Sequence, residues 1–283
     1  MATFLKFLKT QEKRAQKAGL EAEGVKLLVL ELSGYNGVEF VSNLNTVIPL
    51  KKEQELLKAL DEYIINKKPV QHIVGYSYFY GYKMIVNQNV LIPRPETEEL
   101  VGYILQKYDE IFPSKKVKAV DVGTGSGAIA IALSKEEPNI SFTATDISSL
   151  ALDVAKQNAL NNEVNIKFYQ GDMLEPLIKN NLKFDILVSN PPYICDEEYV
   201  EDIVKDNEPH VALFGGPDGM HFYDVILKDA SKILNKPNII AFEHSYSKGK
   251  EMLALAKKYF PLGESFIIKD LNGKDRMMFI INR

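Results

Sequence analysis

The tetrapeptide Asn190-Pro191-Pro192-Tyr193 combines groups that could hold a flat, nitrogen-containing substrate. It follows Phe184–Ser189, whose apolar run is typical of a strand buried on both faces. Two prolines end such a strand because neither has an N–H to donate, and they stiffen the chain that follows. An amide side chain, two backbone carbonyls and an aromatic ring should therefore be fixed at the carboxyl end of a strand, where open α/β sheets bind ligands.

These groups suit the methylation of an amide or exocyclic amine, whose delocalised lone pair must be aimed at the methyl donor. We expect the side-chain oxygen of Asn190 and the carbonyl oxygen of Pro191 to accept hydrogen bonds from the two N–H groups of the substrate. We expect Pro192 to keep the loop stiff and Tyr193 to stack on the flat group. The sequence thus predicts three catalytic residues, Asn190, Pro191 and Tyr193, within a substrate-binding stretch that also includes Pro192. A proline-rich turn without any chemical role is the alternative.

A second candidate site is the glycine-rich stretch Gly123-Thr124-Gly125-Ser126-Gly127, between an apolar strand and an apolar helix. Glycines at such a turn let the backbone approach a ligand closely, and the helix N-terminus offers unpaired N–H groups. The same spacing fits the dinucleotide-binding fingerprint. The loop therefore predicts an adenosine-containing cofactor, either a nicotinamide dinucleotide or S-adenosylmethionine. A tight turn without a ligand is the structural alternative.

Three acidic residues and a methionine lie in or directly after candidate strands, at positions where open α/β sheets commonly bind nucleotides. Asp146, about 20 residues beyond the glycines, is expected to bind ribose hydroxyls, with a helix cap or turn as the alternative. Asp172 and Met173 follow the third strand. Asp172 could contact the adenine or cap the next helix, and Met173 could line an adenine pocket or belong to the core. Asp121 lies inside the first strand, where a buried carboxylate requires a partner or a cationic ligand.

Alternating strands and helices after residue 115 must position these groups. The predicted strands are Val117–Val122, Ser141–Thr145, Val164–Tyr169, Phe184–Ser189, Ile239–Glu243, Glu264–Ile268 and Arg276–Ile281, and the predicted helices are Ala128–Lys135, Ser149–Asn161, Met220–Leu234 and Lys248–Tyr259. This alternation indicates an α/β fold with a mostly parallel, doubly wound sheet. Only Lys269–Asp275 separates the last two strands, too few residues for a crossover helix, so these strands should pair antiparallel.

The N-terminal part of the chain has a different pattern. Residues 1–75 are predicted to form a small helical domain, in which Leu50–Asn66 is a clear amphipathic helix. Residues 76–92 are rich in aromatic and β-branched residues and predict a linking β-hairpin with its turn near Gly81. Residues 93–283 then form the predicted catalytic domain.

Composition excludes several classes of protein. The chain has 283 residues, 46% of them hydrophobic and 25% charged, and a net charge of -4, which does not indicate a nucleic-acid-binding protein. No stretch is long and apolar enough for a transmembrane helix. A single cysteine, Cys195, fits a reducing compartment and hence the cytoplasm. Four scattered histidines lack metal-ligand spacing, so no metal site is predicted, and no feature specifies an oligomeric state.

Motifs around these sites resemble the HemK/PrmC-type protein-(glutamine-N5) methyltransferases. The matching stretches run from about Pro69 to the end of the chain and are Ile92–Glu98, Asp121–Ala130, Phe184–Ile194, Glu208–Gly219 and Asp270–Arg276. Asn-Pro-Pro-Tyr alone is shared with DNA and RNA amino-methyltransferases. Arg-Pro-Glu-Thr-Glu before it and Gly-Gly-Pro-Asp-Gly after it are more specific.

The resemblance implies a Rossmann-like class I methyltransferase fold with a seven-stranded sheet. It implies methyl transfer from S-adenosyl-L-methionine to the glutamine of the Gly-Gly-Gln motif in class I peptide chain release factors. The cofactor would contact Gly123–Gly127, Asp146, Asp172 and Met173, with Asn190 between cofactor and substrate. The helical domain would recognise the release factor, without direct binding of nucleic acid.

Two departures from the family pattern stand out. Met173 occupies a position where the family often has an aromatic residue, and Glu243–Lys248 replaces a Glu-x-Gly-x-x-Gln pattern, so we assign no role there. Three alternatives stay open: a nucleic-acid amino-methyltransferase of the N6-adenine type, a nicotinamide-dependent oxidoreductase, and a non-catalytic adaptor. We further expect Arg94 to brace the turn beside the cofactor pocket, and a loop at Glu208 and Gly215-Gly216 to close over the Asn-Pro-Pro-Tyr site.

Overall fold

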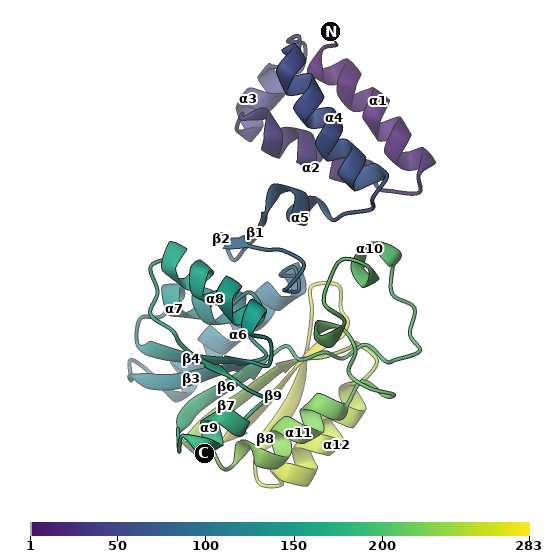
Figure 1. The fold of residues 1–283 in the computed structure, drawn as a ribbon. Coiled ribbons are helices and arrows are strands. Elements are labelled where there is room, and N and C mark those ends of the chain that lie inside the picture. Colours follow the sequence, from purple (N-terminus) through teal and green to yellow (C-terminus); the bar gives the residue numbers. More distant parts are fainter. Residues whose placement is uncertain (1) are drawn as a thin grey trace. The chain divides into compact units, whose positions relative to one another are not determined.

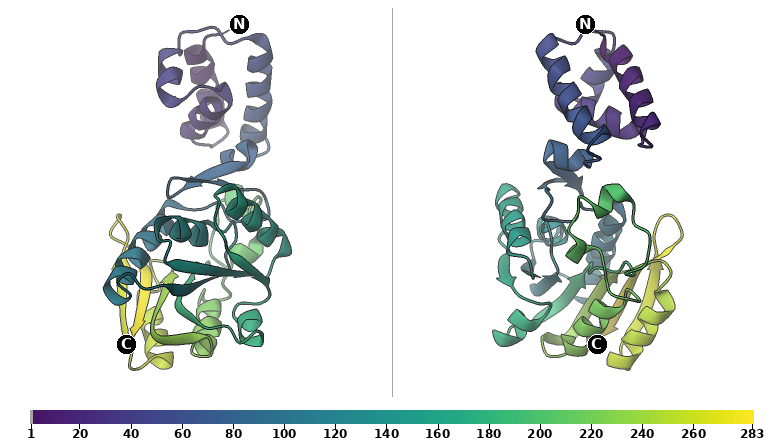
Figure 2. Two further views of the ribbon diagram at one scale, coloured as in Figure 1. Left: turned by 90° about the vertical axis from the view of Figure 1, so that its left-hand side faces the viewer. Right: turned by 45° about the vertical axis from the view of Figure 1, so that its right-hand side comes forward.

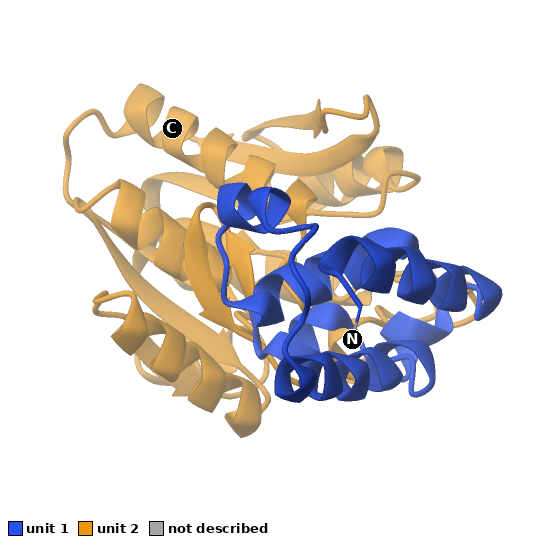
Figure 3. Ribbon diagram, turned by 90° about the horizontal axis from the view of Figure 1, so that it is seen from above, with its two compact units in different colours: residues 1–76, 200–207 blue, residues 77–199, 208–283 orange. Residues whose placement is uncertain are grey.

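The structure is a computed structural model that describes residues 2–283, and it divides into two compact units (Figure 3). The helical unit comprises residues 1–76 and 200–207, and the sheet unit comprises residues 77–199 and 208–283. Met1, the first residue of the predicted helical domain, lies outside the described residues. The sequence did not predict that residues 200–207 return to the helical unit.

The helical unit is held together by apolar residues at helical spacing. Phe4, Phe7 and Leu8 of its first helix are buried, as the i, i+3, i+4 pattern predicts. Ile203, from the segment that returns late in the sequence, packs against the same core. The helices are α1 (Phe4–Lys17), α2 (Ala22–Ser33), α3 (Gly37–Ser42), α4 (Leu50–Ile64), α5 (Val70–Val74) and α10 (Asp202–Lys205).

The sheet unit contains a seven-stranded sheet, which confirms the predicted fold class. Its strands are β3 (Val117–Val122), β4 (Ile140–Asp146), β5 (Lys167–Gln170), β6 (Phe184–Ser189), β7 (Leu234–Glu243), β8 (Glu264–Lys269) and β9 (Asp275–Asn282). Their order is β5-β4-β3-β6-β7-β9-β8, and only β9 runs antiparallel to its neighbours. The hairpin β1 (Tyr76–Phe79) and β2 (Tyr82–Ile85) forms a separate two-stranded sheet.

Helices cover both faces of this sheet (Figures 1 and 2). On one face lie α6 (Pro95–Ile111), α7 (Ala128–Glu136) and α8 (Ser149–Asn161), and on the other lie α9 (Glu175–Lys179), α11 (His221–Ala230) and α12 (Gly249–Tyr259). Successive residues of the central strands point alternately to the two faces. Ala119 packs toward the α6–α7 face, for example, and Val120 packs toward the opposite face.

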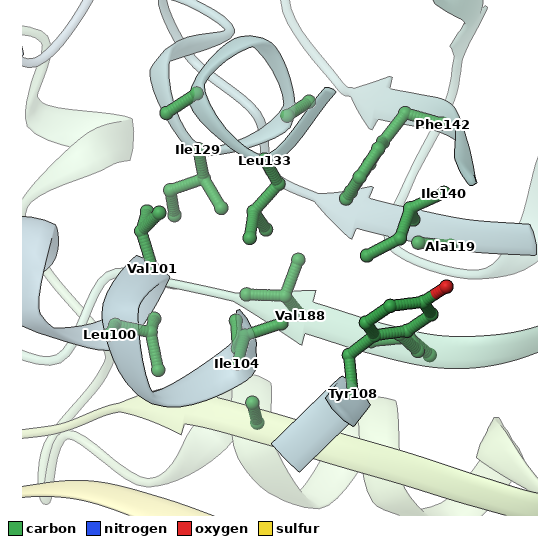
Figure 4. Packing of buried hydrophobic residues seen from close by; sticks show 14 of the residues in the cluster. Leu100, Val101, Ile104, Tyr108, Ala119, Ile129, Leu133, Ile140, Phe142 and Val188 are labelled. Carbon is green, nitrogen blue, oxygen red and sulfur yellow. The ribbon is translucent and has the colours of Figure 1, made fainter. Parts of the chain in front are cut away.

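Core packing fixes the position of α6, whose first turn reaches the candidate site. Leu100, Ile104 and Tyr108 follow i, i+4 spacing and are fully or almost fully buried. They face the strands and the Ile129 and Leu133 side chains of α7 (Figure 4). Burial of each such side chain stabilises the fold by roughly 1.5–3 kcal/mol, so the first turn of α6 is held firmly over the carboxyl ends of the strands.

The sheet has a topological switch point between β3 and β6. From β3 the chain proceeds outward to β4 and β5, and it then returns to place β6 on the other side of β3. Loops that leave adjacent strands in opposite directions open a crevice at their carboxyl ends. The glycine-rich loop after β3 and Asn190 after β6 both lie at this crevice.

Three element boundaries differ from the prediction by three residues or more, and one of them is the start of β7, which was predicted at Ile239 and lies at Leu234. The predicted helix Met220–Leu234 is wrong at its end, because α11 stops at Ala230 and β7 begins at Leu234. The apolar spacing continues past the helix, but Leu234 pairs with Phe184 of β6, so strand pairing overrides it. Strand β5 also begins at Lys167, later than the predicted Val164. No helix among residues 2–283 has the length and apolar character needed to cross a membrane.

Asn158 of α8 ties the hairpin to the glycine-rich loop. Its Oδ1 atom accepts a hydrogen bond from Ile85 N at 2.7 Å, and its Nδ2 atom donates to the carbonyl oxygens of Ile85 at 3.0 Å and Ser126 at 2.9 Å. The side chain is completely buried. A single amide thus satisfies backbone groups that β2 and the loop would otherwise leave unpaired.

We expect Asn158→Ala to lower the free energy of unfolding by about 2–4 kcal/mol, because it leaves several buried backbone groups without partners. Urea unfolding followed by circular dichroism would measure the change. Asn161→Ala, on the exposed face of the same helix, should change stability by no more than about 0.5 kcal/mol. Equal losses in the two variants would show that Asn158 has no special structural role.

Candidate active site

A cavity of about 250 Å³ lies at the carboxyl ends of the central strands. The loops after four strands, β3, β4, β5 and β6, contribute to it, together with the start of α6 and the segment around Val211. The predicted site residues that line it are Gly123, Thr124, Gly125, Ser126, Asp146, Asp172, Met173, Asn190 and Pro192. Gly127, Pro191 and Tyr193 do not line it. The structure therefore brings most of the predicted cofactor set together around one cavity.

The glycine-rich loop needs glycine for two different reasons. Gly123 and Gly125 have φ angles of 71° and 54°, a region that other residues adopt rarely, and a Cβ atom on either would meet no protein atom within 4 Å. Their open sides leave room for a ligand. Gly127 instead packs closely, since its Cβ would lie 3.2 Å from side-chain atoms of Ala155 and Ile131. Gly127 thus supports the contact between α7 and α8.

Asp146 both shapes the loop and faces the cavity. Its carboxylate accepts hydrogen bonds from Gly125 N and Ser148 N, each at 2.9 Å. Burial raises the pKa of Asp146, and these N–H groups lower it in part. The turn-forming alternative and the nucleotide-binding role are therefore compatible, because a carboxylate that accepts two hydrogen bonds retains free lone pairs.

Asp121 is a completely buried carboxyl group beside the same loop. Its Oδ2 atom accepts a hydrogen bond from Thr124 Oγ1 at 2.6 Å, whereas its Oδ1 atom has no hydrogen-bond partner in residues 2–283. Burial raises the pKa of Asp121 to about 7, although the hydrogen bond from Thr124 opposes the shift. The nearby Asp146 carboxylate raises this pKa further, and the N–H of Ala130 lowers it.

These two carboxyl groups discriminate between the cofactors that the loop allows. The positive charge of a cationic cofactor such as S-adenosylmethionine would help to compensate the nearby carboxyl groups of Asp121 and Asp146. The pyrophosphate of a nicotinamide dinucleotide would add negative charge beside Asp121 and Asp146. The residues present therefore fit S-adenosylmethionine better than a dinucleotide.

The Asp172–Met173 pair lies at the rim of the cavity. Asp172 is exposed, and Met173 has a φ angle of 40°, which is uncommon for a residue other than glycine. The carbonyl oxygen of Met173 accepts a hydrogen bond from Thr145 Oγ1 at 3.2 Å, which fixes this strained turn beside β4. The turn presents both side chains to the cavity.

Asn190 is connected to a buried carboxylate through one hydroxyl group. Asn190 Nδ2 donates to Thr97 Oγ1 at 3.2 Å, and Thr97 Oγ1 donates to Glu243 Oε2 at 2.6 Å. The alternation along the strands explains this contact. Asn190 continues the positions of β6 that face α6, Glu243 occupies the last such position of β7, and Thr97 lies in the first turn of α6.

The same carboxylate also holds Tyr193, whose hydroxyl donates to Glu243 Oε1 at 3.2 Å. Burial raises the pKa of Glu243, and the hydrogen bond from Thr97, the charge of Arg276 and the hydrogen bond from Tyr193 all lower it. Burial, followed by the nearby Glu243 carboxylate, raises the pKa of Tyr193. Arg276 is held in turn by Asp270, with 3.1 Å between Nε and Oδ2.

Thr97 and Glu243 are site residues that sequence reasoning missed. Glu243 lies in the segment where the family pattern is broken, and for that reason we gave it no role. The available signal was an acid at the end of an apolar strand, the pattern that singled out Asp121. Thr97 lies within the recognised motif Ile92–Glu98, yet neither charge nor spacing distinguished it from its neighbours.

Arg94 and Glu208 form an ion pair beside the cavity. Arg94 Nη2 lies 2.5 Å from Glu208 Oε1, and Glu208 Oε2 accepts a hydrogen bond from Ile92 N at 2.9 Å. Glu208 is 4% exposed. The pair joins the turn before α6 to the loop that follows residue 207, so Arg94 both braces the turn and lines the cavity.

Two glycines of the downstream motif pack against the Asn-Pro-Pro-Tyr backbone. A Cβ atom on Gly215 would lie 2.4 Å from the carbonyl oxygen of Pro192, and one on Gly219 would lie 2.3 Å from that of Tyr193. The loop also pairs with the chain after Tyr193, since Ile194 N donates to Leu213 O at 3.0 Å. The downstream loop therefore fixes the backbone of the candidate substrate site.

His244, next to Glu243, is buried and neutral. Its Nδ1 atom lies 2.8 Å from the carbonyl oxygen of Ser245 and must donate to it, which leaves Nε2 unprotonated and without a partner in the described residues. Burial lowers the pKa of His244. Cys195 has no hydrogen-bonded base beside it in the described residues, so the geometry supports no nucleophilic thiol.

Comparison with known proteins identifies relatives over almost the whole chain. Residues 104–211 match the family described as methyltransferase small domain. A release factor glutamine methyltransferase of Bacillus subtilis (strain 168) is 41% identical over 281 residues, which cover 98% of this chain and 96% of that protein. A protein of the same name from Flavobacterium psychrophilum is 42% identical over 216 residues, 75% of each chain.

Solved structures share the fold at lower identity. A methyltransferase from Pyrococcus furiosus has a TM-score of 0.51 and 19% identity, over 81% of this chain and 98% of that chain. A 16S rRNA methyltransferase of T. thermophilus, solved with AdoMet and guanosine, has a TM-score of 0.51 and 12% identity, over 74% of this chain and 50% of that chain. At such identities the likeness establishes the fold alone.

We expect Asp121→Asn to change how stability depends on pH. The pKa of Asp121 is about 7 in the folded protein and about 4 in an unfolded chain. Between these values the folded state holds a proton that the unfolded state has lost, so wild-type stability falls as pH rises. From pH 5 to pH 8 the variant should therefore gain about 2–3 kcal/mol relative to wild type in urea unfolding.

The exposed Asp153 of α8 provides the control for this comparison. The difference in stability between Asp153→Asn and wild type should change by less than about 0.5 kcal/mol over the same pH range. A difference between Asp121→Asn and wild type that stays constant from pH 5 to pH 8 would contradict the raised pKa of Asp121.

Gly219→Ala should destabilise the protein more than Gly216→Ala. Both glycines have positive φ angles, of 69° and 87°, so both variants carry a backbone cost of roughly 1–2 kcal/mol. The added methyl group would collide with the carbonyl of Tyr193 only at Gly219, because its nearest neighbour at Gly216 is His221 Cβ at 3.4 Å. Thermal unfolding should show a lower midpoint for Gly219→Ala, and equal midpoints would exclude the close contact.

Proposed function

The chain belongs to the family of release factor glutamine methyltransferases, and we propose on that basis which residues perform the reaction. The reaction is methyl transfer from S-adenosyl-L-methionine to the side-chain amide nitrogen of the glutamine in the Gly-Gly-Gln motif of class I peptide chain release factors. The observation that carries the assignment is a pair of unused acceptors in adjacent residues, of which Asn190 lines the cavity. No donor in residues 2–283 reaches Asn190 Oδ1 or the carbonyl oxygen of Pro191.

These two acceptors match the two N–H bonds of a primary amide. When both bonds are held, the plane of the amide is fixed and the nitrogen lone pair can point only above or below it. Asn190 lines the cavity, so the lone pair can be directed to the bound methyl donor. Pro191 and Pro192 keep the acceptors in place before the substrate arrives, and the ring of Tyr193 can limit tilting of the plane.

The cofactor site is proposed on the same cavity. Gly123–Gly127 would lie against the cofactor mainly through their backbone, which carries no side chain at the open positions Gly123 and Gly125. Asp146 would accept hydrogen bonds from ribose hydroxyls. Asp172 and Met173 would border the adenine ring, and Asp121 supplies negative charge beside the loop. When bound, S-adenosylmethionine supplies an electrophilic methyl group on a positively charged sulfur.

Deprotonation needs no dedicated base in this site. A nitrogen that gains a methyl group becomes strongly acidic, so one of its protons can pass to water late in the reaction. Asn190 can hold that N–H while the charge develops, because its Oδ1 atom is a neutral acceptor. The buried Glu243 reaches Asn190 only through Thr97, so it acts on Asn190 rather than on the substrate.

Charge around the cavity favours a protein substrate over a nucleic acid. Arg94 is the one cation among the described residues that line the cavity, which also has the carboxylates of Asp146 and Asp172. A polyanion would require a basic groove, and the net charge of the chain is -4. We propose that the helical unit recognises the release factor and that the reaction takes place in the cytoplasm, where translation ends.

We expect Asn190→Ala to lower kcat by roughly 100-fold or more, because one of the two acceptors that orient the amide is lost. Mass spectrometry of a release factor after incubation with enzyme and S-adenosylmethionine would record a gain of one methyl group on the glutamine. Asn161→Ala, distant from the cavity, should retain wild-type activity. Undiminished methylation by Asn190→Ala, or methylation of DNA or RNA in place of the release factor, would overturn the assignment.

A further inference from the structure

We propose that Thr97 and Glu243 are positioning residues that fix the Asn190 side-chain amide so that its oxygen, and not its nitrogen, faces the substrate. This inference rests on the proposed function, since it concerns the polarity of the acceptor that holds the glutamine amide. It assigns a role to Glu243, in a segment where the family pattern is broken and gives no guidance.

An asparagine acceptor carries an inherent ambiguity. The oxygen and the NH2 group of its amide are nearly equal in size, so a half-turn of the group exchanges an acceptor for two donors. In the reversed orientation the NH2 group of Asn190 would meet the NH2 group of the substrate, donor against donor. The substrate would then be repelled at the position where it must be held. Selective binding of an amide therefore requires a neighbour that allows only one orientation of Asn190.

Thr97 supplies that selection because its hydroxyl has a single proton. Glu243 Oε2 lies 2.6 Å from Thr97 Oγ1, and a carboxylate can only accept, so the proton of Thr97 is directed there. Toward Asn190, Thr97 then offers only a lone pair. Asn190 must present its Nδ2 atom to Thr97, at 3.2 Å, and its Oδ1 atom is left facing away from Thr97.

Glu243 is held in place to perform this task. Its side chain is 1% exposed and Tyr193 donates to its other oxygen at 3.2 Å, so both oxygens of the carboxylate have a donor. Burial raises the pKa of Glu243, and the hydrogen bonds from Thr97 and Tyr193, together with the charge of Arg276, itself paired with Asp270, oppose that shift. One carboxyl group that accepts from both neighbours therefore sets the orientation of the Asn190 amide and also holds the hydroxyl of Tyr193, the two side chains proposed to flank the substrate amide.

The test compares two substitutions of Thr97. Thr97→Val keeps the shape of the side chain and removes the hydroxyl, whereas Thr97→Ser keeps the hydroxyl and removes the methyl group. We expect Thr97→Val to lower kcat about 10- to 100-fold, and Thr97→Ser to stay within about threefold of wild type. The affinity for S-adenosylhomocysteine and the thermal midpoint should be similar in both variants, because neither substitution alters the strand-end loops proposed to hold the cofactor.

Glu243→Gln tests the carboxylate itself. Glutamine has one acceptor oxygen for two donors, Thr97 and Tyr193, so at least one of them must turn away. We expect a loss in kcat at least as large as that of Thr97→Val. Binding of S-adenosylhomocysteine should remain within about threefold of wild type, since Glu243 does not line the cavity.

A double-mutant cycle then shows whether Thr97 acts through Asn190. In an Asn190→Ala background, measured with excess enzyme in a single turnover, Thr97→Val should cause no further loss, because no amide remains to be oriented. Additive losses would overturn the inference, as would an unchanged kcat in Thr97→Val or in Glu243→Gln, or equal losses in the valine and serine variants. Failure of the wild-type enzyme to methylate the release factor would instead overturn the proposed function.

Discussion

The site depends on the alternation of side chains along three adjacent strands. Residues two apart on β3, β6 and β7 face the same side of the sheet. Asp121 and Glu243 hold the last such positions of β3 and β7, and Asn190 continues the series one residue beyond the end of β6. All three therefore lie on the face covered by α6 and α7. A shift of one residue in any strand would move its functional group to the opposite face. The register of the whole sheet, and not one loop, thus determines whether the constellation exists.

Two of these three groups oppose folding. Asp121 and Glu243 are carboxyl groups with almost no contact with solvent, and burial of either charge costs stability unless partners compensate it. The apolar layers on both sides of the sheet can offset that cost, since they contain most of the large buried side chains. Polar groups at otherwise apolar positions mark the places where the sequence favours chemistry over stability.

The sequence was sufficient for the fold class and for nine of the residues that line the cavity, but not for the contacts that link segments far apart in the chain. Strand and helix patterns predicted the seven strands, because short segments rich in apolar, aromatic and β-branched residues alternate with helical segments and turn residues. The strand order and the contact of Thr97 with Glu243 could not be predicted, since they join segments far apart in the chain. Likewise, the packing of Gly219 against Tyr193 depends on how two loops meet.

The discontinuous helical unit has a consequence for the order in which the protein is synthesised. Ile203 packs in its core and Asn207 Nδ2 donates to Lys67 O at 3.0 Å, so the unit is complete only when residue 207 has been made. By then the glycine-rich loop and Asn190 have already been synthesised. The helical unit therefore cannot finish folding before much of the sheet unit has been synthesised. Removal of residues 1–76 would also leave the apolar Ile203 without its core.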